Sequence, residues 1–373
     1  MAEFDTDTLL AGIRSWVEHE SPTDAPDAIS SLVAGIQAEA ESFGARTQRV
    51  AGRDGFGDHL IVRSPWGAEG EKGILVMSHL DTVHPLGSLE RMPFRVEGNI
   101  AFGPGICDMK GGAYIALSAL KELIAEGRNT ALPITHLFTS DEEVGSPTSV
   151  ELIRSLGAQA KYVLVTEPAR EGGKIVTARK GTARFEVHVK GRPAHSGSRH
   201  EDGRSAIEEL ARQILILHSF TDYARGVTVN VGRISGGTRA NVVAEEAHAL
   251  VDMRVPNPAI AEEMVAKVKG LRPVGPDVTV TVTGGLNRPP YEKLPGIATL
   301  FDHAKLLAAE IGFDLQDLKT GGGSDGNFTA DLAPTLDGLG VDGKGGHTDY
   351  EQIHVDSIVP RARLLRRLME TLE

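Results

Sequence analysis

At 373 residues the chain exceeds the size at which a single hydrophobic core is comfortable, so its length predicts two domains. Its 40% hydrophobic and 24% charged residues match the composition of soluble globular proteins. The formal net charge of -12 argues against nucleic acid or an anionic membrane as a partner.

Few features of the sequence bear on cellular location. Cys107 is the single cysteine, which rules out an intramolecular disulfide and suits a reducing compartment. Residues 1–20 contain no basic segment followed by an apolar stretch, and no apolar run approaches the roughly 20 residues of a membrane helix. We therefore expect a cytoplasmic protein.

The first half of the chain alternates short apolar runs with a helical pattern. Residues 73–78, 134–139 and 162–166 are apolar runs typical of buried strands. Between the first two runs, residues 111–126 place their apolar side chains on one helical face. Strands separated by helices predict an α/β fold with a mainly parallel sheet and helices on both faces. Ligands of such sheets bind at the carboxyl ends of the strands.

The pattern changes after residue 180. Residues 184–190 alternate apolar and polar side chains, as in a strand with one exposed face. The elements expected next are a helix, two strands, a helix and a strand, at residues 205–218, 227–234, 247–254, 260–269 and 278–283. This order predicts a small α+β sandwich, residues 181–290, inserted into a catalytic domain made of residues 1–180 and 291–373.

Histidines and acidic residues concentrate in five short segments, four of which follow predicted strands. They are Ser78 to Val83 with His79 and Asp81, Gly103 to Gly112 with Asp108, Thr139 to Gly145 with Glu142 and Glu143, Thr166 to Pro168 with Glu167, and Gly345 to Glu351 with His347. His79 and Asp81 are two residues apart in an extended segment, so both side chains can point into one site. Two histidines and three carboxylates can hold two zinc ions, with one carboxylate bridging them around an activated water.

These motifs resemble those of the co-catalytic zinc metallopeptidases, the family that includes glutamate carboxypeptidase (carboxypeptidase G), aminoacylase, acetylornithine deacetylase and succinyl-diaminopimelate desuccinylase. The resemblance runs from about Leu9 to Leu372 and is densest at residues 78–83, 103–112, 141–145, 321–325 and 347–351. The glutamate carboxypeptidase branch is nearest, because Pro93 to Gly98 and the Gly-Gly-Gly-Ser-Asp run also match it.

The resemblance implies two Zn²⁺ ions per subunit, which Co²⁺ or Mn²⁺ can replace. His79 and Glu167 would bind one ion. Glu143 and His347 would bind the other, and Asp108 would bridge the two.

The resemblance also implies roles for two further acidic residues. Glu142 would be the general base that takes a proton from the bridging water and passes it to the leaving nitrogen. Asp81 would hydrogen-bond His79 and fix its tautomer.

His354, His84 and Cys107 are the alternatives to these ligands. His347 is followed by the family's Thr-x-x-Glu pattern, whereas His354 is not. We therefore expect His354 to be a polar residue before the final helix. His84 is expected at the rim of the site or in a structural role, and Cys107 as a small packed thiol.

The inserted domain carries the expected substrate-recognition residues. His195 lies in a turn, residues 191–197, that resembles a family turn whose histidine reaches across a dimer interface and polarises the scissile carbonyl. The alternative is a turn histidine that caps the following helix. The resemblance thus implies a homodimer, with the inserted domain as lid and dimerisation domain closing over the substrate.

Asn241 and Arg254 match family positions that bind the substrate near its carbonyl and carboxylate groups. Arg288 matches an arginine that the glutamate carboxypeptidases use for the side-chain carboxylate of the substrate. Arginine suits a carboxylate because its planar guanidinium makes two parallel charge-assisted hydrogen bonds. Gly322 and Gly323 would let the backbone approach the bound substrate. An exposed arginine with no binding role is the alternative for Arg288.

One feature departs from the glutamate carboxypeptidase branch. The substrate-binding lysine of that branch has no clear counterpart, although Lys174 and Lys180 lie in the corresponding part of the chain. The leaving group therefore stays open between glutamate, aspartate, another amino acid and a small amino-acid conjugate. The expected partner is a small or dipeptide-like substrate with a carboxylate.

The leading hypothesis is a hydrolase for an amide bond next to a free carboxylate, as in a metallo-carboxypeptidase or an N-acyl-amino-acid amidohydrolase. A dipeptidase or aminopeptidase, which must hold an α-amino group, is the first alternative. A deaminase or amidase acting on an aromatic acid is the second. A protein that only binds metal and ligand would normally have lost a ligand or the base, and all of these residues are present.

Overall fold

The computed structural model describes residues 4–68 and 70–373. These residues form two compact units. The first runs to Thr177 and resumes over Lys293–Lys319 and Ser324–Glu373, and the second comprises Ala178–Glu292 with Thr320–Gly323. Within the described ranges, no helix combines the length and the apolar character needed to cross a membrane.

A six-stranded sheet, in the order β1-β2-β6-β3-β7-β14, lies at the centre of the first unit. Its strands are β1 (Arg46–Val50), β2 (His59–Arg63), β3 (Gly73–His79), β6 (Ile134–Thr139), β7 (Ala160–Val165) and β14 (Thr335–Leu336). β3 runs parallel to β6 and β7, and β14 runs parallel to β7, whereas β2 is antiparallel to both of its neighbours. The mainly parallel sheet expected from the sequence is confirmed.

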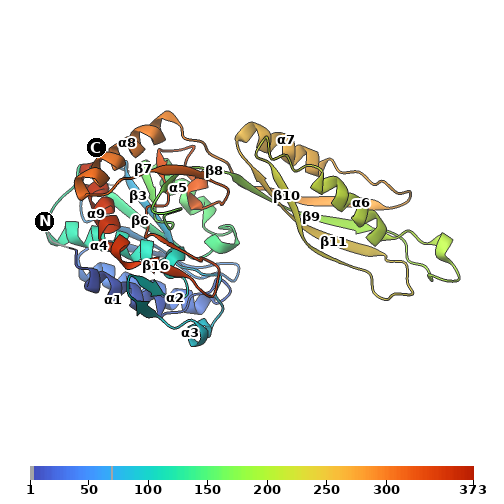
Figure 1. The fold of residues 1–373 in the computed structure, drawn as a ribbon, viewed down its shortest axis with the longest axis horizontal. Helices are drawn as coiled ribbons and strands as arrows, with labels where there is room; N and C mark the ends of the chain where they lie inside the picture. Colours follow the sequence, from blue (N-terminus) through green and yellow to red (C-terminus); the bar gives the residue numbers. More distant parts are fainter. Residues whose placement is uncertain (1–3, 69) are drawn as a thin grey trace. The chain divides into compact units, whose positions relative to one another are not determined.

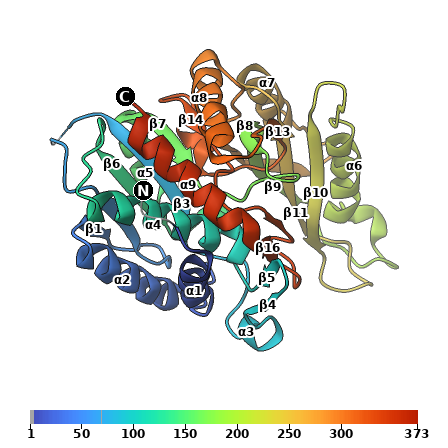
Figure 2. The same ribbon diagram turned by 60° about the vertical axis from the view of Figure 1, so that its left-hand side comes forward.

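Helices cover both faces of this sheet (Figure 2). Leu75 and Met77 of β3 pack with Ile153 of α5 in one core cluster. Ile74 and Val76 alternate with them along the strand and are buried on the opposite face. The helices of the unit are α1 (Thr6–Val17), α2 (Pro26–Ser42), α3 (Ser88–Arg91), α4 (Gly111–Ala125), α5 (Val150–Ala158), α8 (Pro295–Ile311) and α9 (Val355–Thr371).

The start of α4 lies against the segment that follows β7. A Cβ on Gly112 would lie 2.0 Å from the carbonyl oxygen of Thr166, so glycine is required for this approach. The contact brings the loop that carries Asp108, just ahead of α4, next to the loop that carries Glu167.

Short strands form two smaller sheets. The first has the order β15-β16-β5-β4 and consists of β15 (Gly343–Lys344), β16 (Gln352–His354), β5 (Ile100–Phe102) and β4 (Arg95–Glu97). It is antiparallel throughout and places the segment before Asp108 beside the segment that carries His347. The second pairs β8 (Ile175–Arg179) with β13 (Asp317–Thr320).

The second unit is a four-stranded antiparallel sheet with two helices on one face (Figure 1). Its strands, in the order β10-β11-β9-β12, are β10 (Thr228–Gly236), β11 (Glu246–Val255), β9 (Gly181–Lys190) and β12 (Thr279–Arg288). The helices are α6 (Ala206–His218) and α7 (Pro258–Lys269). Val187 and Val189 of β9 are buried with Leu210 of α6 in the core of this unit. The side chain between the two valines therefore projects to the other face of the sheet.

Two strands of this unit are longer than the sequence pattern predicts. β9 starts at Gly181, before the predicted start at residue 184. Residues 181–183 are all buried, so they do not show the alternation by which the strand is recognised. β12 continues beyond Thr283 through Gly284, where a Cβ would lie 2.2 Å from the carbonyl oxygen of Arg184. Glycine permits this close approach, but it also interrupts the alternating pattern by which a strand is recognised.

Leu217 and Leu215 of α6 form a matched pair that tests this packing. Leu217 is 0% exposed and Leu215 is 74% exposed. We predict that Leu217→Ala lowers the free energy of unfolding by about 2–5 kcal/mol, because it removes buried methyl groups and leaves a cavity. Leu215→Ala should change it by less than about 0.5 kcal/mol. Urea unfolding measures both, and equal losses would contradict the helix orientation.

Candidate active site

Three of the predicted site segments lie at the carboxyl ends of adjacent parallel strands. His79 is the last residue of β3. Glu142 and Glu143 start the short helix η2 (Glu142–Val144), which follows β6. Glu167 comes directly after the end of β7 and Thr166. Because β6, β3 and β7 are neighbours in the sheet, their side chains gather at one edge of it.

Asp108 and His347 reach the site from outside the central sheet. Asp108 lies in η1 (Ile106–Lys110), between β5 of the small sheet and α4. His347 lies in the loop between β15 and β16 with φ 65°, a left-handed conformation that is uncommon for residues other than glycine. The small sheet therefore delivers two of the five predicted ligands, an arrangement that the sequence pattern does not predict.

The carboxylate of Asp108 lies between the two histidines. Its Oδ1 is 3.1 Å from His79 Nε2, and its Oδ2 is 3.5 Å from His347 Nε2. His79 Nε2 also lies 3.8 Å from Glu167 Oε1, and His347 Nε2 lies 3.0 Å from Glu143 Oε2. The five side chains thus form two histidine–carboxylate pairs joined by a shared carboxylate.

These contacts shift the pKa values of the groups involved. Burial raises the pKa of Asp108, but hydrogen bonds with His347 and His79 outweigh burial and hold that pKa far below its usual range. Burial lowers the pKa of His79, but hydrogen bonds with Asp108 and Asp81 raise it well above its usual value. Hydrogen bonds to Asp108 and, to a smaller extent, to Glu143 raise the pKa of His347 to about 10. The arrangement therefore favours positive charge on both sides of Asp108.

The donor set fits divalent metal ions. Among the described residues, two groups of three potential ligands meet here with their ligand atoms within 4.8 Å of one another: His79, Glu142 and Glu167, and His79, Asp108 and Glu143. Glu143 Oε1 is buried and has no hydrogen-bond partner, and a cation would supply one. Imidazole and carboxylate are ligands that Zn²⁺ takes in catalytic sites.

Asp81 organises the segment that carries the two glutamates. Its buried carboxylate accepts hydrogen bonds from the backbone N–H groups of Glu142 and Glu143 at 3.2 and 3.1 Å. Thr23 Oγ1 donates a further hydrogen bond of 2.8 Å. His79 Nδ1 lies 2.9 Å from the backbone carbonyl oxygen of Asp81 and 3.5 Å from its carboxylate. Asp81 therefore contacts His79 most closely through its backbone.

Glu351 holds the loop of Asp108, a role that the sequence alone does not reveal. Its buried carboxylate accepts hydrogen bonds from the backbone N–H groups of Gly105, Cys107 and Asp108 at 2.8, 2.8 and 2.9 Å. His84 Nε2 lies 2.6 Å from the same carboxylate. The family's Thr-x-x-Glu spacing marks Glu351 in the sequence, but the spacing does not identify its partners.

Two more buried carboxylates accept hydrogen bonds that hold the segment after β6 in place. Asp141 accepts hydrogen bonds from the backbone N–H and the hydroxyl of Thr148 at 2.6 and 2.7 Å. Asp325 accepts hydrogen bonds from Thr139 Oγ1, at 3.0 Å, and from Ser146 Oγ. In the sequence, Asp325 is visible only as the last residue of the Gly-Gly-Gly-Ser-Asp run.

The predicted substrate residues lie in the second unit and fall into two groups. His195 and Asn241 lie on adjoining loops, where the backbone N–H of Ser196 donates to the carbonyl oxygen of Asn241 at 3.1 Å. Both residues are exposed. His195 Nδ1 accepts hydrogen bonds from the backbone N–H groups of Gly197 and Ser198 at 3.1 and 3.2 Å. Neutral His195 therefore carries its proton on Nε2 and can donate it in a hydrogen bond.

Arg254 and Arg288 form the second group, at the other end of the same sheet. Both are register partners of Thr182, Arg254 from β11 and Arg288 from β12. A Cβ on Gly323 would lie 2.8 Å from Arg288 Cδ and 3.2 Å from Thr182 Cγ2, so Gly323 packs closely against Arg288 and Thr182. Arg254 also makes two hydrogen bonds, of 2.7 and 3.0 Å, to the carboxylate of Asp252.

The length of β9 separates the two groups. The loop with His195 follows the end of β9, whereas the arginine pair lies at its start. At about 3.3 Å per residue, the 10 residues of β9 span roughly 30 Å. His195 and Asn241 therefore do not meet the arginine pair within one copy of this unit. Gly322 lies on the arginine side, where its carbonyl oxygen accepts a hydrogen bond of 3.1 Å from Arg179 Nη1.

The alternative residues named from the sequence have other partners. His354 Nδ1 lies 3.1 Å from Asp342 Oδ2 at the start of α9. Cys107 is buried, and burial raises the pKa of its thiol well above the usual value. Lys174 Nζ lies 3.7 Å from the carboxylate of Glu171.

Similarity to known proteins covers nearly the whole chain. A sequence model of peptidase family M20/M25/M40 matches residues 75–371. The chain belongs to this family. Carboxypeptidase G2 from Pseudomonas sp. (strain RS-16) is 32% identical to the M20 chain described here, over 98% of this chain and 89% of that protein.

Solved structures share the M20 fold. A tripeptidase from Staphylococcus aureus superposes with a TM-score of 0.81 at 20% identity, over 99% of both chains. A dinuclear metal-binding peptidase of the M20 family from Bacillus subtilis superposes with a TM-score of 0.68 at 15% identity, over 98% of this chain and 99% of that one. Both likenesses concern the fold.

Membership in family M20 makes this chain a hydrolase of peptide or amide bonds. M20 peptidases bind metal in dinuclear centres, and the residues around Asp108 are candidate ligands for such a centre. The family resemblance and the fold class expected from the sequence are both confirmed.

Glu351→Gln tests the support of the Asp108 loop. An amide cannot accept hydrogen bonds from three backbone N–H groups as a carboxylate does, so the loop should loosen. We predict that the affinity for Zn²⁺ falls about 10–100-fold. Competition with a chelating dye measures this affinity, and Asp349→Asn, at an exposed neighbouring position, is the control. Equal affinities in the two variants would show that Glu351 does not support metal binding.

Proposed function

We propose that this M20 enzyme is a two-zinc hydrolase that cleaves an amide bond next to a free carboxylate in small substrates, as a glutamate carboxypeptidase or an N-acyl-amino-acid amidohydrolase does. One observation carries the proposal: the Asp108 carboxylate lies between His79 and His347, each with a further carboxylate beside it. The 32% identity to carboxypeptidase G2 supports the carboxypeptidase type.

The five side chains divide into two ligand sets in this proposal. His79 and Glu167 would hold one ion. Glu143 and His347 would hold the other, and Asp108 would be shared. When bound, such a pair of ions acidifies water and polarises the scissile carbonyl. Nitrogen and oxygen ligands of this kind accept Zn²⁺ and also Co²⁺ or Mn²⁺.

Glu142 is the general base of the proposed reaction. Its carboxylate lies within 4.8 Å of the ligand atoms of His79 and Glu167, and its backbone N–H is held by Asp81. From this position it takes a proton from the attacking water and delivers it to the leaving nitrogen. The nitrogen then departs as a neutral amine, which lowers the barrier to breaking the amide bond.

Arg254 and Arg288 would bind the carboxylate groups of the substrate. They flank Thr182 on the sheet of the second unit, and each guanidinium can make two parallel charge-assisted hydrogen bonds to a carboxylate. Arg254 already binds the carboxylate of Asp252 in this way, which illustrates the geometry a substrate would use. Gly323 keeps the space beside Arg288 free of a side chain.

His195 and Asn241 would act from a second copy of the chain. They lie roughly 30 Å along β9 from the arginine pair, so one copy of the second unit cannot use both groups on a small substrate. In a homodimer, His195 would donate from Nε2 to the developing oxyanion. Light scattering at the assay concentration measures the molar mass in solution, which we expect to be that of a dimer. A fully active monomer would remove this role from His195.

Glu142→Ala separates catalysis from metal binding. We predict that the variant keeps both metal ions and loses at least about a hundredfold in kcat, because it lacks the base. Elemental analysis and steady-state kinetics on the same preparation measure the two effects. Glu151→Ala, on the surface of α5, should behave as the unmodified enzyme. A loss in kcat of less than tenfold in Glu142→Ala would exclude the general-base role.

Arg254→Ala tests carboxylate recognition. We predict a loss in kcat/KM of roughly tenfold to a hundredfold for an N-acyl amino acid, since a hydrogen bond to a charged group is removed. The corresponding amino-acid amide, which lacks the carboxylate, should be little affected. Arg225→Ala is the control, because Arg225 binds the exposed Glu263 in the same unit.

Equal losses on the two substrates would contradict the assignment of Arg254. Dipeptides with a free amino group and a blocked carboxylate complete the panel. Preferential cleavage of these by the unmodified enzyme would favour an aminopeptidase instead.

A further inference from the structure

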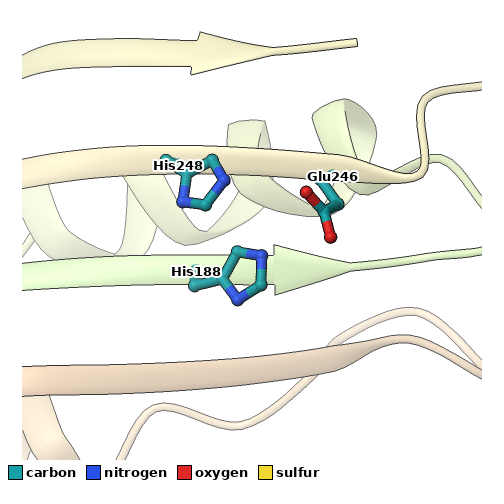
Figure 3. A group of neighbouring side chains, drawn as sticks. All are labelled: His188, Glu246 and His248. Atoms are coloured by element: carbon teal, nitrogen blue, oxygen red, sulfur yellow. The ribbon is translucent and has the colours of Figure 1, made fainter.

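A second group of metal-ligand side chains lies in the second unit, apart from the Asp108 site. It consists of His188 on β9 and of Glu246 and His248 on β11 (Figure 3). Figure 3 shows the three side chains on adjacent strands with their polar ends close together. None of the three belongs to the machinery proposed for amide hydrolysis.

Strand alternation places the three side chains on one face of the sheet. Their neighbours along the strands are buried in the core with α6 and α7: Val187, Val189, Ala247 and Ala249. His188, Glu246 and His248 therefore project to the face without helices. His188 and His248 are direct register partners across β9 and β11, and Glu246 lies two residues before His248 on the same face.

The spacing of the group suits one metal ion. The two imidazole rings are stacked, with centroids 4.3 Å apart and an interplanar angle of 12°. One ligand atom from each residue lies within 4.8 Å of the others. A tetrahedral Zn²⁺ with ligands at about 2.0–2.1 Å separates them by roughly 3.4 Å. The ligand atoms would have to move closer together, by rotation of the side chains, to share one ion.

An orphaned nitrogen gives independent support. His188 Nε2 is buried and has no hydrogen-bond partner. A buried ring nitrogen without a partner costs free energy, and a metal ion would satisfy it. Ser235 and Thr281, opposite His248 and His188 in the outer strands, continue the row with small side chains. On the central strands, Lys190 lies opposite Glu246 and Glu186 lies opposite Leu250 on the same face.

We propose that His188, His248 and Glu246 bind a divalent transition-metal ion of the Zn²⁺, Ni²⁺ or Cu²⁺ type, separately from the ions of the catalytic centre. Two imidazoles and one carboxylate are ligands that these ions prefer. The ion joins β9 to β11 across the open face of the sheet and leaves one coordination position for water or for a donor from another molecule. This site is independent of the proposed hydrolytic function.

Metal stoichiometry of the full-length protein tests the proposal. Each protein is stripped with a chelator, dialysed against micromolar Zn²⁺ and analysed for bound metal. The unmodified protein should bind one equivalent more than His188→Ala/His248→Ala, whatever number the catalytic centre holds. His200→Ala/His218→Ala removes two exposed histidines of the same unit and should keep the full number. Equal stoichiometry in all three proteins would overturn the proposal.

The extra equivalent must also be independent of the catalytic centre. In a His79→Ala/His347→Ala background, adding His188→Ala/His248→Ala should again remove one equivalent. Glu246→Gln should weaken this ion's affinity at least about tenfold, because a carboxylate ligand is lost. No difference in the first comparison, or an unchanged affinity in the second, would contradict the three-ligand site.

Histidine modification provides a readout that needs no variant. Diethyl pyrocarbonate labelling of the unmodified protein, followed by mass spectrometry, reports each histidine separately. Zn²⁺ should protect His188 and His248 but leave the labelling of His200 and His218 unchanged. Labelling of His188 and His248 that does not respond to Zn²⁺ would overturn the proposal, even if the substituted proteins fail to fold.

Discussion

The carboxylate of Asp108, mostly buried and placed between two histidines, sets the main physical constraint on this M20 enzyme. Glu143 and Glu167 lie beside the same histidines, so negative charge is concentrated where water is largely excluded. Burying a carboxylate costs several kcal/mol unless cations and hydrogen bonds compensate for it. Positive charge on the two imidazoles compensates for part of this cost, and divalent ions would compensate for more of it. Metal binding and histidine protonation therefore compete at this site.

Other carboxylates build the frame that keeps this charge in place. Asp81 and Glu351 both accept hydrogen bonds from backbone N–H groups, one in the segment after β6 and the other in the loop of Asp108. Such bonds fix the backbone, and thereby the direction in which each ligand leaves it. The close approach of Gly112 to Thr166 fixes the same region by packing. The site thus depends on the loops around it as much as on the strands.

The sequence predicted what periodicity and local motifs encode. The buried strands β3 and β6 and the alternating β9 were identifiable because each has a regular pattern of side chains. The short strands of the small sheet are too brief for such a pattern, so the route by which Asp108 and His347 reach the site could not be predicted. The role of Glu351 depends on partners far away in the sequence. The ligand and substrate roles of individual residues stay predictions.

Anomalous X-ray scattering from crystals of the zinc-loaded enzyme tests the central claim most directly. Data collected on both sides of the zinc absorption edge locate each ion without relying on activity. The account predicts two peaks, one on each side of the Asp108 carboxylate, the first beside His79 and the second beside His347. A map with no zinc peak in contact with Asp108, from crystals grown with zinc in excess, would contradict it.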